Sequence, residues 1–251
     1  MTDYSVLVLS CDKYEPLWSQ FFERFFKYWP KKNENVSLLT NFANPNFENV
    51  NNILIGEDRD WSSNLLLALS SIKTEYVFII LDDVFIKSYI DVDFFDHLLD
   101  FVNKEKPNYL NTKNRPVPRG PKKERYVREL VKGSHYRSSI TNAFWKTKTL
   151  KSLLVPGENP WEFERKGAFR SNNLNSFFGT TKSLIQIHHL IIGGKISRSV
   201  WRSIEINKKV LSSFPIQTIF EEIKHELTIL RNKSFSKLVP QKWQQIIRKQ
   251  F

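Results

Sequence analysis

The chain of 251 residues has a single cysteine, Cys11, which excludes two classes of protein. A disulfide scaffold needs paired cysteines, and a cysteine-based zinc site needs several of them. Long apolar runs are also missing, since the longest covers only the six residues 76–81. A membrane-spanning helix requires about 20 such residues. The N-terminus has neither a basic stretch nor a small-residue cleavage site, so no signal peptide is predicted and a cytoplasmic protein is expected.

Glycine is scarce, with eight residues, and the glycine-rich motifs of many nucleotide enzymes are absent. The chain has no Gly-x-Gly-x-x-Gly fingerprint, no P-loop and no Gly-x-Ser-x-Gly nucleophile turn. Aromatic residues, in contrast, make up 14% of the chain and hydrophobic residues 41%. This composition excludes a largely disordered protein and is sufficient for a sizeable buried core.

Acidic residues are few in the second part of the chain. Residues 1–100 hold 16 acids and 8 bases, a net charge of −8, whereas residues 101–251 hold 10 acids and 30 bases, a net charge of +20. The overall charge of +12 would suit a nucleic-acid-binding protein. We expect no nucleic-acid partner, because the acidic first part would repel a duplex and no recognition motif is present.

Short apolar runs alternate with helical patterns in the first hundred residues. This alternation predicts an α/β fold with a mixed, mainly parallel sheet flanked by helices. Strands are expected at residues 5–10, 36–40, 53–55 and 75–81, and helices at 15–29, from a cap at Ser62 or Ser63 to 73, and at 92–104.

The basic part is less regular. Within residues 107–137, Pro116, Pro118 and Pro121 lie among nine Lys or Arg, which favours a basic loop or irregular insert. A helix is expected at 138–155 and a strand at 184–192. Two units follow from this pattern: residues 1–204 as the main domain, and 205–251 as a basic helical extension.

The pair Asp82-Asp83 is the sharpest motif, because it directly follows the most apolar strand. Ligands of parallel α/β sheets bind beyond the carboxyl ends of the strands. Two carboxylates there would suit a divalent cation, which in turn would hold a diphosphate. The alternative is that one aspartate caps the next element and the other is solvated.

Two further turns are expected at the same edge of the sheet. The first strand leads into Ser10, Asp12 and Lys13, whose polar groups suit a nucleotide base and ribose. The third strand leads to Asp58 and Trp61, although a capped helix with a core tryptophan would explain these residues equally well.

Glu162 and Glu164 stand two positions apart after Pro160. On an extended segment they would share one face, whereas on a helix they would not. A positioned carboxylate can act as a general base on a hydroxyl group. The alternative is a surface turn anchored by Trp161.

His189 ends a β-rich run, and Lys195 follows a Gly-Gly turn. A histidine can complete a metal shell, and a lysine beside a glycine turn can bind phosphate. A histidine in a strand is, however, more often structural.

Taken together, these motifs resemble GT-A fold glycosyltransferases, above all the group encoded in bacterial lipopolysaccharide and capsule gene clusters. The resemblance spans about residues 4–200 and is carried by four segments. These are Leu-Ser-Cys-Asp-Lys-Tyr at 9–14, Asp-Trp-Ser at 60–62, the strand at 76–85 with its Asp-Asp pair, and Glu-Asn-Pro-Trp-Glu-Phe-Glu at 158–164. One departure is that Val84 stands where the Asp-x-Asp signature of the family has its last acid.

The resemblance implies transfer of a sugar from a nucleoside diphosphate to a hydroxyl of a glycan or lipid-linked glycan. Ser10, Asp12, Lys13, Asp58, Trp61 and Asp82 would bind the donor nucleotide, and Lys195 its diphosphate. Asp83 and His189 would hold Mn²⁺ or Mg²⁺. Glu162 or Glu164 would be the base of an inverting displacement, and a retaining route stays open.

Three alternatives remain at this point: a nucleotidyltransferase, a nucleic-acid-binding protein and a non-catalytic partner in a polysaccharide assembly. The basic C-terminal region, with Trp243, Ile246 and Ile247 at helical spacing, also suits a peripheral helix on an anionic membrane. A helix packed on the domain is the competing interpretation.

Overall fold

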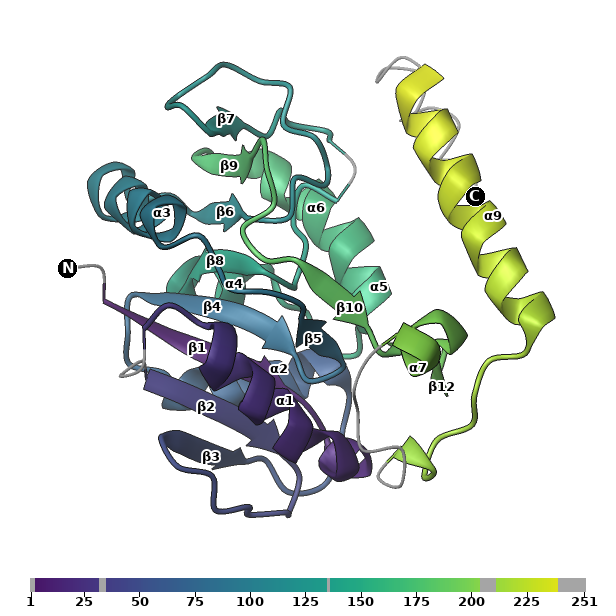
Figure 1. The fold of residues 1–251 in the computed structure, drawn as a ribbon. Coiled ribbons are helices and arrows are strands. Elements are labelled where there is room, and N and C mark those ends of the chain that lie inside the picture. Colours follow the sequence, from purple (N-terminus) through teal and green to yellow (C-terminus); the bar gives the residue numbers. More distant parts are fainter. Residues whose placement is uncertain (1–2, 32–34, 135, 204–210, 239–251) are drawn as a thin grey trace.

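A computed structural model describes residues 3–31, 35–134, 136–203 and 211–238 of the chain. Its centre is an eight-stranded mixed sheet with the strand order β3-β2-β1-β4-β8-β6-β9-β7 (Figure 1). The strands are β1 (Tyr4–Leu9), β2 (Asn35–Thr40), β3 (Val50–Leu54), β4 (Tyr76–Leu81), β6 (Tyr109–Asn111), β7 (Val127–Glu129), β8 (Ala143–Lys146) and β9 (Phe177–Thr180). The predicted α/β fold with a mixed, mainly parallel sheet is confirmed.

The first four strands are parallel, and the register of β1 and β4 pairs Leu9 with Leu81. These two strands therefore end side by side, which places Ser10 beside Asp82. Strand β8 runs antiparallel to both β4 and β6. The residues just before β8 consequently lie at the edge where β4 and β6 end.

Helices cover both faces of the sheet. Helices α1 (Glu15–Tyr28) and α3 (Val92–Glu105) pack on one face, and α2 (Trp61–Ser71) and α4 (Thr147–Leu153) on the other. Side chains of β1 alternate between the two cores: Val6 and Val8 face α1, and Leu7 and Leu9 face α2. This alternation is the period of two expected of a strand buried on both faces.

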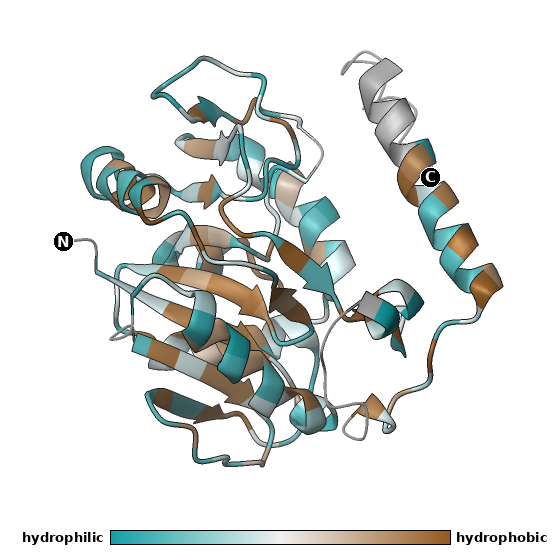
Figure 2. Cartoon of the chain, in the orientation of Figure 1, coloured by the Kyte–Doolittle hydropathy of each residue, from teal (hydrophilic) through white to brown (hydrophobic). Residues whose placement is uncertain are grey.

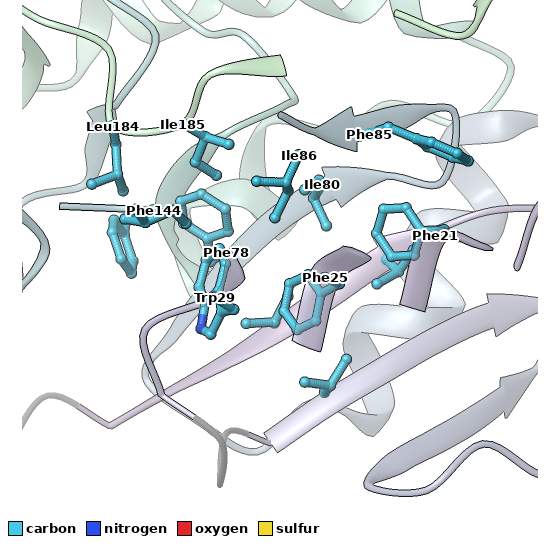
Figure 3. Close-up of a cluster of buried hydrophobic side chains, with 14 of the residues drawn as sticks. Phe21, Phe25, Trp29, Phe78, Ile80, Phe85, Ile86, Phe144, Leu184 and Ile185 are labelled. Carbon is cyan, nitrogen blue, oxygen red and sulfur yellow. The ribbon is translucent and has the colours of Figure 1, made fainter. Parts of the chain in front are cut away.

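Aromatic side chains of α1 fill one core (Figure 3). Phe21, Phe25 and Trp29 follow at intervals of four residues, which puts them on one helix face. The rings of Phe25 and Trp29 stack with centroids 4.9 Å apart, and Trp29 meets Phe78 of β4 at 5.3 Å. The aromatic content of the sequence is thus used largely to attach α1 to the sheet.

Smaller elements extend the edge where β4 ends. Strand β5 (Val84–Ile86) pairs with β10 (Ile187–His189), and β11 (Ile191–Ile192) pairs with β12 (Lys195–Ile196). Four short helical pieces follow α4 in the chain: α5 (Pro160–Glu162), the π-helical η2 (Phe163–Gly167), α6 (Ala168–Arg170) and η3 (Ser171–Asn173). Helices α7 (Arg198–Ser203) and α9 (Ile219–Leu238) complete the described chain, and η1 (Asp12–Tyr14) follows β1.

Several sequence predictions need correction. Residues 107–137 are not only an irregular insert, because β6 and β7 both belong to the central sheet. The helix expected at 138–155 is strand β8 followed by the shorter α4, and the strand expected at 184–192 is two short strands, β10 and β11. Short apolar runs such as these cannot be assigned to helix or strand by periodicity alone. The cap of α2 is Asp60, whose carboxylate accepts the N–H of Ser63, rather than a serine.

Helix α9 leaves the sheet and carries exposed apolar side chains, among them Phe220, Leu227 and Leu230 (Figure 2). Within the described ranges, no helix combines the length and the apolar character needed to cross a membrane. The boundary predicted at 204/205 and the membrane-facing residues Trp243, Ile246 and Ile247 lie outside the described residues. Both stay predictions.

Candidate functional site

Polar side chains from several strands meet at the carboxyl-terminal edge of the sheet. Ser10 follows β1, Asp82 and Asp83 follow β4, and Lys113 follows β6. The segment 138–142 enters the same edge from the other direction, because the N–H of Asn142 bonds to the carbonyl of Ile79. The edge predicted from strand order therefore exists, and it includes residues that the sequence motifs did not reveal.

Asp82 is buried within a hydrogen-bonded network. Its Oδ2 accepts a hydrogen bond from the hydroxyl of Ser10 and another from the indole N–H of Trp18, at 3.3 Å. Trp18 also donates to Ser10 Oγ at 2.6 Å. Burial, together with the charge of the neighbouring Asp83, raises the pKa of Asp82 to about 8. The carboxyl group of Asp82 thus joins β1, α1 and β4, and its predicted contact with a nucleotide stays a prediction.

The pairing of β5 with β10 brings the backbone of Asp83 close to that of His189. His189 lies opposite Val84, and the N–H of Leu190 donates to the carbonyl of Asp83 at 2.8 Å. Burial raises the pKa of Asp83 to about 6, and its Oδ1 is buried without a hydrogen-bond partner among the described residues. Desolvation, followed by the charge of Lys113, lowers the pKa of His189, which favours the neutral imidazole that binds metals.

These residues fit a divalent cation only in part. The described ranges contain no group of three or more His, Cys, Asp or Glu arranged to hold a metal ion. The unpaired, buried Oδ1 of Asp83 is nevertheless an oxygen of the kind that Mg²⁺ or Mn²⁺ prefers. Such cations commonly take one or two protein ligands and complete their shell with substrate phosphates and water. The donor set therefore suits a cation shared with a diphosphate rather than one held by protein alone.

Asp12 organises the turn after β2. Its carboxylate accepts the backbone N–H groups of Asn41, Phe42 and Ala43 at 2.8, 2.9 and 3.0 Å. Lys13, its neighbour, is exposed. The Asp12 side chain thus fixes one loop at the sheet edge, which is a structural use of a residue predicted to bind the nucleotide.

Asp58 and Trp61 lie at the start of α2. Asp58 is exposed and accepts a hydrogen bond from the side-chain amide of Asn64. Trp61 is half-buried, and its ring lies 5.6 Å from that of Phe163. Trp61 therefore joins α2 to the segment that carries the two predicted catalytic glutamates.

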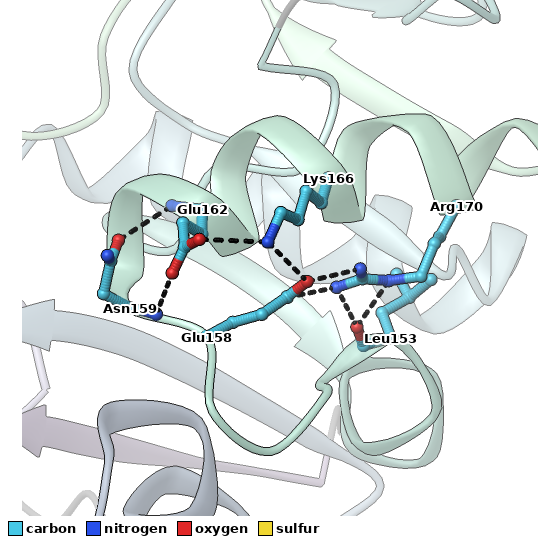
Figure 4. Close-up of polar contacts among 6 residues, drawn as sticks. All are labelled: Leu153, Glu158, Asn159, Glu162, Lys166 and Arg170. Carbon is cyan, nitrogen blue, oxygen red and sulfur yellow. Dashed lines mark hydrogen bonds and ion pairs between the residues drawn. The ribbon is translucent and has the colours of Figure 1, made fainter.

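That segment is helical, so Glu162 and Glu164 do not share a face. Glu162 closes a capping box with Asn159 and also bonds to Lys166 at 3.0 Å (Figure 4). The N–H of Asn159 first, and then Lys166, lower the pKa of Glu162. Both carboxylate oxygens of Glu162 already have partners within their own helix, which favours a role as a helix cap.

Glu158 and Arg170 attach this segment to the domain. The guanidinium of Arg170 contacts both carboxylate oxygens of Glu158, at 2.8 and 2.6 Å, and also donates to the carbonyl of Leu153 (Figure 4). Glu158 is buried, and its carbonyl accepts the N–H of Ser62. Such a bidentate pair fixes geometry better than a single contact does, so both ends of the segment that carries Glu164 are held in place.

Glu164 faces the sheet edge. Its Oε1 accepts the hydroxyl of Ser139 at 2.6 Å and the N–H of Ile140 at 3.0 Å. Neither contact engages Oε2, which has no hydrogen-bond partner within the part of the chain that the structure describes. Of the two predicted glutamates, Glu164 is therefore the one with an oxygen available for a substrate proton.

Lys113 is one of the residues of this site that the sequence analysis did not identify. Its ammonium group donates to Ser139 Oγ at 2.6 Å and to Thr141 Oγ1 at 3.0 Å. Burial lowers the pKa of Lys113, and the charge of Glu164 opposes that effect. The signal was weak: Lys113 follows the short apolar pair Tyr109-Leu110 inside the proline-rich stretch assigned to a loop.

Lys195 lies at the outer side of the site, where its ammonium group contacts Glu221 Oε1 of α9 at 2.5 Å. The Lys195 contact, followed by the backbone N–H of Thr218, lowers the pKa of Glu221 to about 2. An open pocket of about 370 Å³ lies next along the chain, lined by Arg198, Trp201, Arg202 and Ile216. This side of the site is basic, as a diphosphate would require.

Comparison with known proteins finds the fold but no family. No family model matches the chain, and the search of curated proteins finds no significant match. Among solved structures, Staphylococcus aureus TarS residues 1–349 in complex with UDP has a TM-score of 0.53 and 14% identity, covering 97% of this chain and 77% of that one. A crystal structure of S. aureus TarS has a TM-score of 0.50 and 13% identity, and covers 73% of this chain but 36% of its own.

The chain thus spans about a third of that longer TarS chain. Identities this low establish the arrangement of the elements and not the reaction. The fold of this protein is GT-A-like, with a mixed eight-stranded sheet flanked by helices.

Proposed function

We propose that the protein is a glycosyltransferase that moves a sugar from a nucleoside diphosphate to a hydroxyl of a surface-polysaccharide acceptor. One observation carries the proposal. The Asp82-Asp83 pair at the end of β4 and the carboxylate of Glu164 reach the same edge of a GT-A-like sheet from different elements. The acidic pair suits the donor side of such a reaction and Glu164 suits the acceptor side.

The donor nucleotide is assigned to the turns after β1 and β3. Ser10, Lys13 and Trp61 line these turns, and Asp12, Asp58 and Asp82 hold the turns in shape through their hydrogen bonds. The structure of TarS in complex with UDP supports a uridine nucleotide as the first donor to test.

The donor diphosphate is assigned to the basic side of the site. Lys195 belongs to β12, and Arg198 and Arg202 of the following helix α7 line one pocket. The bond between the sugar and the diphosphate breaks with negative charge developing on the diphosphate, so fixed positive groups there stabilise the transition state.

A divalent cation would be held by Asp83 and His189 together with the diphosphate. When bound, Mn²⁺ or Mg²⁺ would supply positive charge to the leaving diphosphate. Asp83 contributes the oxygen that lacks a partner, and His189 contributes a neutral nitrogen.

Glu164 acts as the general base in this proposal. The acceptor hydroxyl gives its proton to Oε2 of Glu164 while its oxygen forms a bond to the anomeric carbon. The bonding electrons of the departing glycosidic bond go to the diphosphate, and the configuration at the anomeric carbon inverts. Glu162 caps the helix that presents Glu164, and we assign it no contact with the substrate.

The acceptor is proposed to be a glycan or lipid-linked glycan. Trp201 lines the same pocket as the two arginines assigned to the diphosphate, and it offers an aromatic ring for the glycan. The basic region beyond α9 would bring the enzyme to an anionic membrane surface, where lipid-linked acceptors are found.

The decisive experiment is a screen of nucleotide sugars by thermal shift with and without Mn²⁺, followed by an assay of donor hydrolysis or transfer. Stabilisation by a uridine-diphosphate sugar and release of UDP are expected. Release of pyrophosphate from a nucleoside triphosphate and a sugar phosphate would instead identify a nucleotidyltransferase. Robust binding to random DNA at physiological salt would contradict the proposal.

The role of Glu164 is tested by Glu164→Gln, with Glu162→Gln as its matched control. The first variant should lose turnover by a factor of roughly 100 or more, while its affinity for the donor stays the same. The control should keep most of its turnover. Full activity of Glu164→Gln would exclude this glutamate as the base.

A further inference from the structure

Lys113 is held firmly where β6 ends. Its N–H donates to the side-chain oxygen of Asn111 at 2.8 Å, and its carbonyl accepts the hydroxyl of Ser183 at 2.7 Å. The ammonium group is thereby directed into the space before β8, where it meets the hydroxyls of Ser139 and Thr141. Burying an ammonium group is costly unless it is hydrogen-bonded and close to negative charge.

The nearby negative charge is Glu164, which Lys113 reaches through Ser139. A lysine ammonium can only donate hydrogen bonds, and a carboxylate can only accept them. Ser139 Oγ must therefore accept from Lys113 and donate its proton to Glu164, at 2.6 Å on each side. The donor and the acceptor of both hydrogen bonds are therefore fixed by the chemistry of the three groups.

The backbone of Ser139 is held as rigidly as its side chain. Its N–H donates to the hydroxyl of Tyr109 at 3.0 Å, and the same hydroxyl donates to the Ser139 carbonyl at 3.1 Å. Both residues are buried. Because Tyr109 belongs to β6, the serine that contacts Glu164 is positioned by the central sheet rather than by a surface loop.

We propose that Lys113 is a positioning residue, which acts through Ser139 to fix the carboxylate of Glu164 for proton abstraction from the acceptor. The inference rests on the proposed function, in which Glu164 is the base. The hydroxyl of Ser139 and the N–H of Ile140 occupy Oε1 of Glu164 and leave Oε2 to the substrate hydroxyl. Lys113 and Ser139 do not touch the substrate.

The test compares Lys113→Met and Ser139→Ala in the full-length enzyme, alone and combined with Glu164→Gln. Each single variant should lower kcat by roughly 10-fold, the loss expected when a catalytic group is less well oriented. The KM for the donor should not change. In the Glu164→Gln background neither substitution should reduce the residual rate further, because both act through the residue already changed.

Thr141→Val serves as the matched control, since it removes a hydroxyl that contacts Lys113 but not Glu164. Its kcat should fall less than that of Ser139→Ala. Circular dichroism and melting temperature show whether each variant is folded, and Lys113→Arg should recover part of the lost rate by restoring the positive charge.

The amide proton of Ile140 gives a readout that does not depend on activity, because it donates to the same oxygen of Glu164. Its NMR resonance should shift in Lys113→Met and Ser139→Ala if Glu164 has lost its fixed position. An unchanged resonance would overturn the proposal, whatever reaction the enzyme catalyses. A changed resonance in a protein whose Glu164→Gln variant stays fully active would support the hydrogen-bond chain but reject the base.

The proposal would also be overturned if Lys113→Met and Ser139→Ala lowered kcat by the same factor with Glu and with Gln at position 164. That outcome would mean that Lys113 and Ser139 support the fold of the edge rather than the position of one side chain. A rise in donor KM without loss of kcat would have the same meaning.

Discussion

Lys195 Nζ lies 2.5 Å from Glu221 Oε1, which joins β12 to the first turn of α9. The carboxylate therefore occupies the ammonium group that we assign to the donor diphosphate. A diphosphate that binds Lys195 must compete with Glu221 for it.

Glu221→Gln should therefore strengthen donor binding. The neutral amide competes less well for the ammonium group, and a roughly two- to five-fold lower Kd for UDP is expected from the modest energy of exposed ion pairs. Isothermal titration calorimetry measures the effect. Glu222→Gln, one residue further along the same helix, is the control and should leave the Kd as it is. If both variants bind UDP alike, Glu221 does not compete with the donor.

Asp82 should make the protein less stable as the pH rises. Its pKa is about 8 in the folded protein and near 3.8 when exposed, so the folded state binds the proton more strongly. The stabilisation is complete below about pH 4 and is lost as the pH rises toward 8. Asp82→Asn should flatten this dependence, so that the free energy of unfolding falls by a few kcal/mol less between pH 4 and pH 8. Urea unfolding at several pH values checks it, and parallel curves for both proteins would contradict it.

The pair of Glu158 and Arg170 should contribute strongly to stability. Glu158→Gln leaves the guanidinium without its charged partner, and removing one member of a buried pair costs about 3–5 kcal/mol. Arg170 is 27% exposed, so we expect the lower part of that range. Glu162→Gln, which affects a more exposed pair, should lower the free energy of unfolding much less. Equal free energies of unfolding for the two variants would show that burial does not distinguish them.

Asp12→Ala separates the structural use of Asp12 from its predicted contact with the nucleotide. Three backbone N–H groups lose their acceptor, and a cost of about 1–2 kcal/mol is expected because water can replace part of the bonding. If the aspartate also contacts the ribose, Kd for UDP should rise by more than 10-fold in the folded variant. An unchanged Kd would limit Asp12 to holding the loop at residues 41–43.

The first four strands could be predicted because each is a compact apolar run beside a helix with a clear apolar face. The same pattern placed Ser10 near Asp82, since parallel strands end at the same edge. Residues 107–137 and 138–155 were misread for a physical reason. Strands as short as β6 are held by their neighbours in the sheet, and three or four residues carry too little periodicity to show it.

Glu162 and Glu164 show the same difference between what the sequence predicts and what the structure decides. Their spacing of two residues favoured a shared face only if the segment was extended, and the helix around them turns their side chains apart. Asn159 and Pro160 are typical of a helix start, so the local sequence did contain the sign of this outcome.

By itself, the sequence determined the α/β class, the position of the acidic pair and the absence of disulfide or glycine-loop chemistry, because these depend on residue type and local order. Only the tertiary structure decided which side chains meet. Lys113, Ser139 and Glu164 come from three separate segments, and their contacts depend on the antiparallel register of β8 with β4 and β6. Such contacts arise from chain pairing over long sequence separations, which no local pattern encodes.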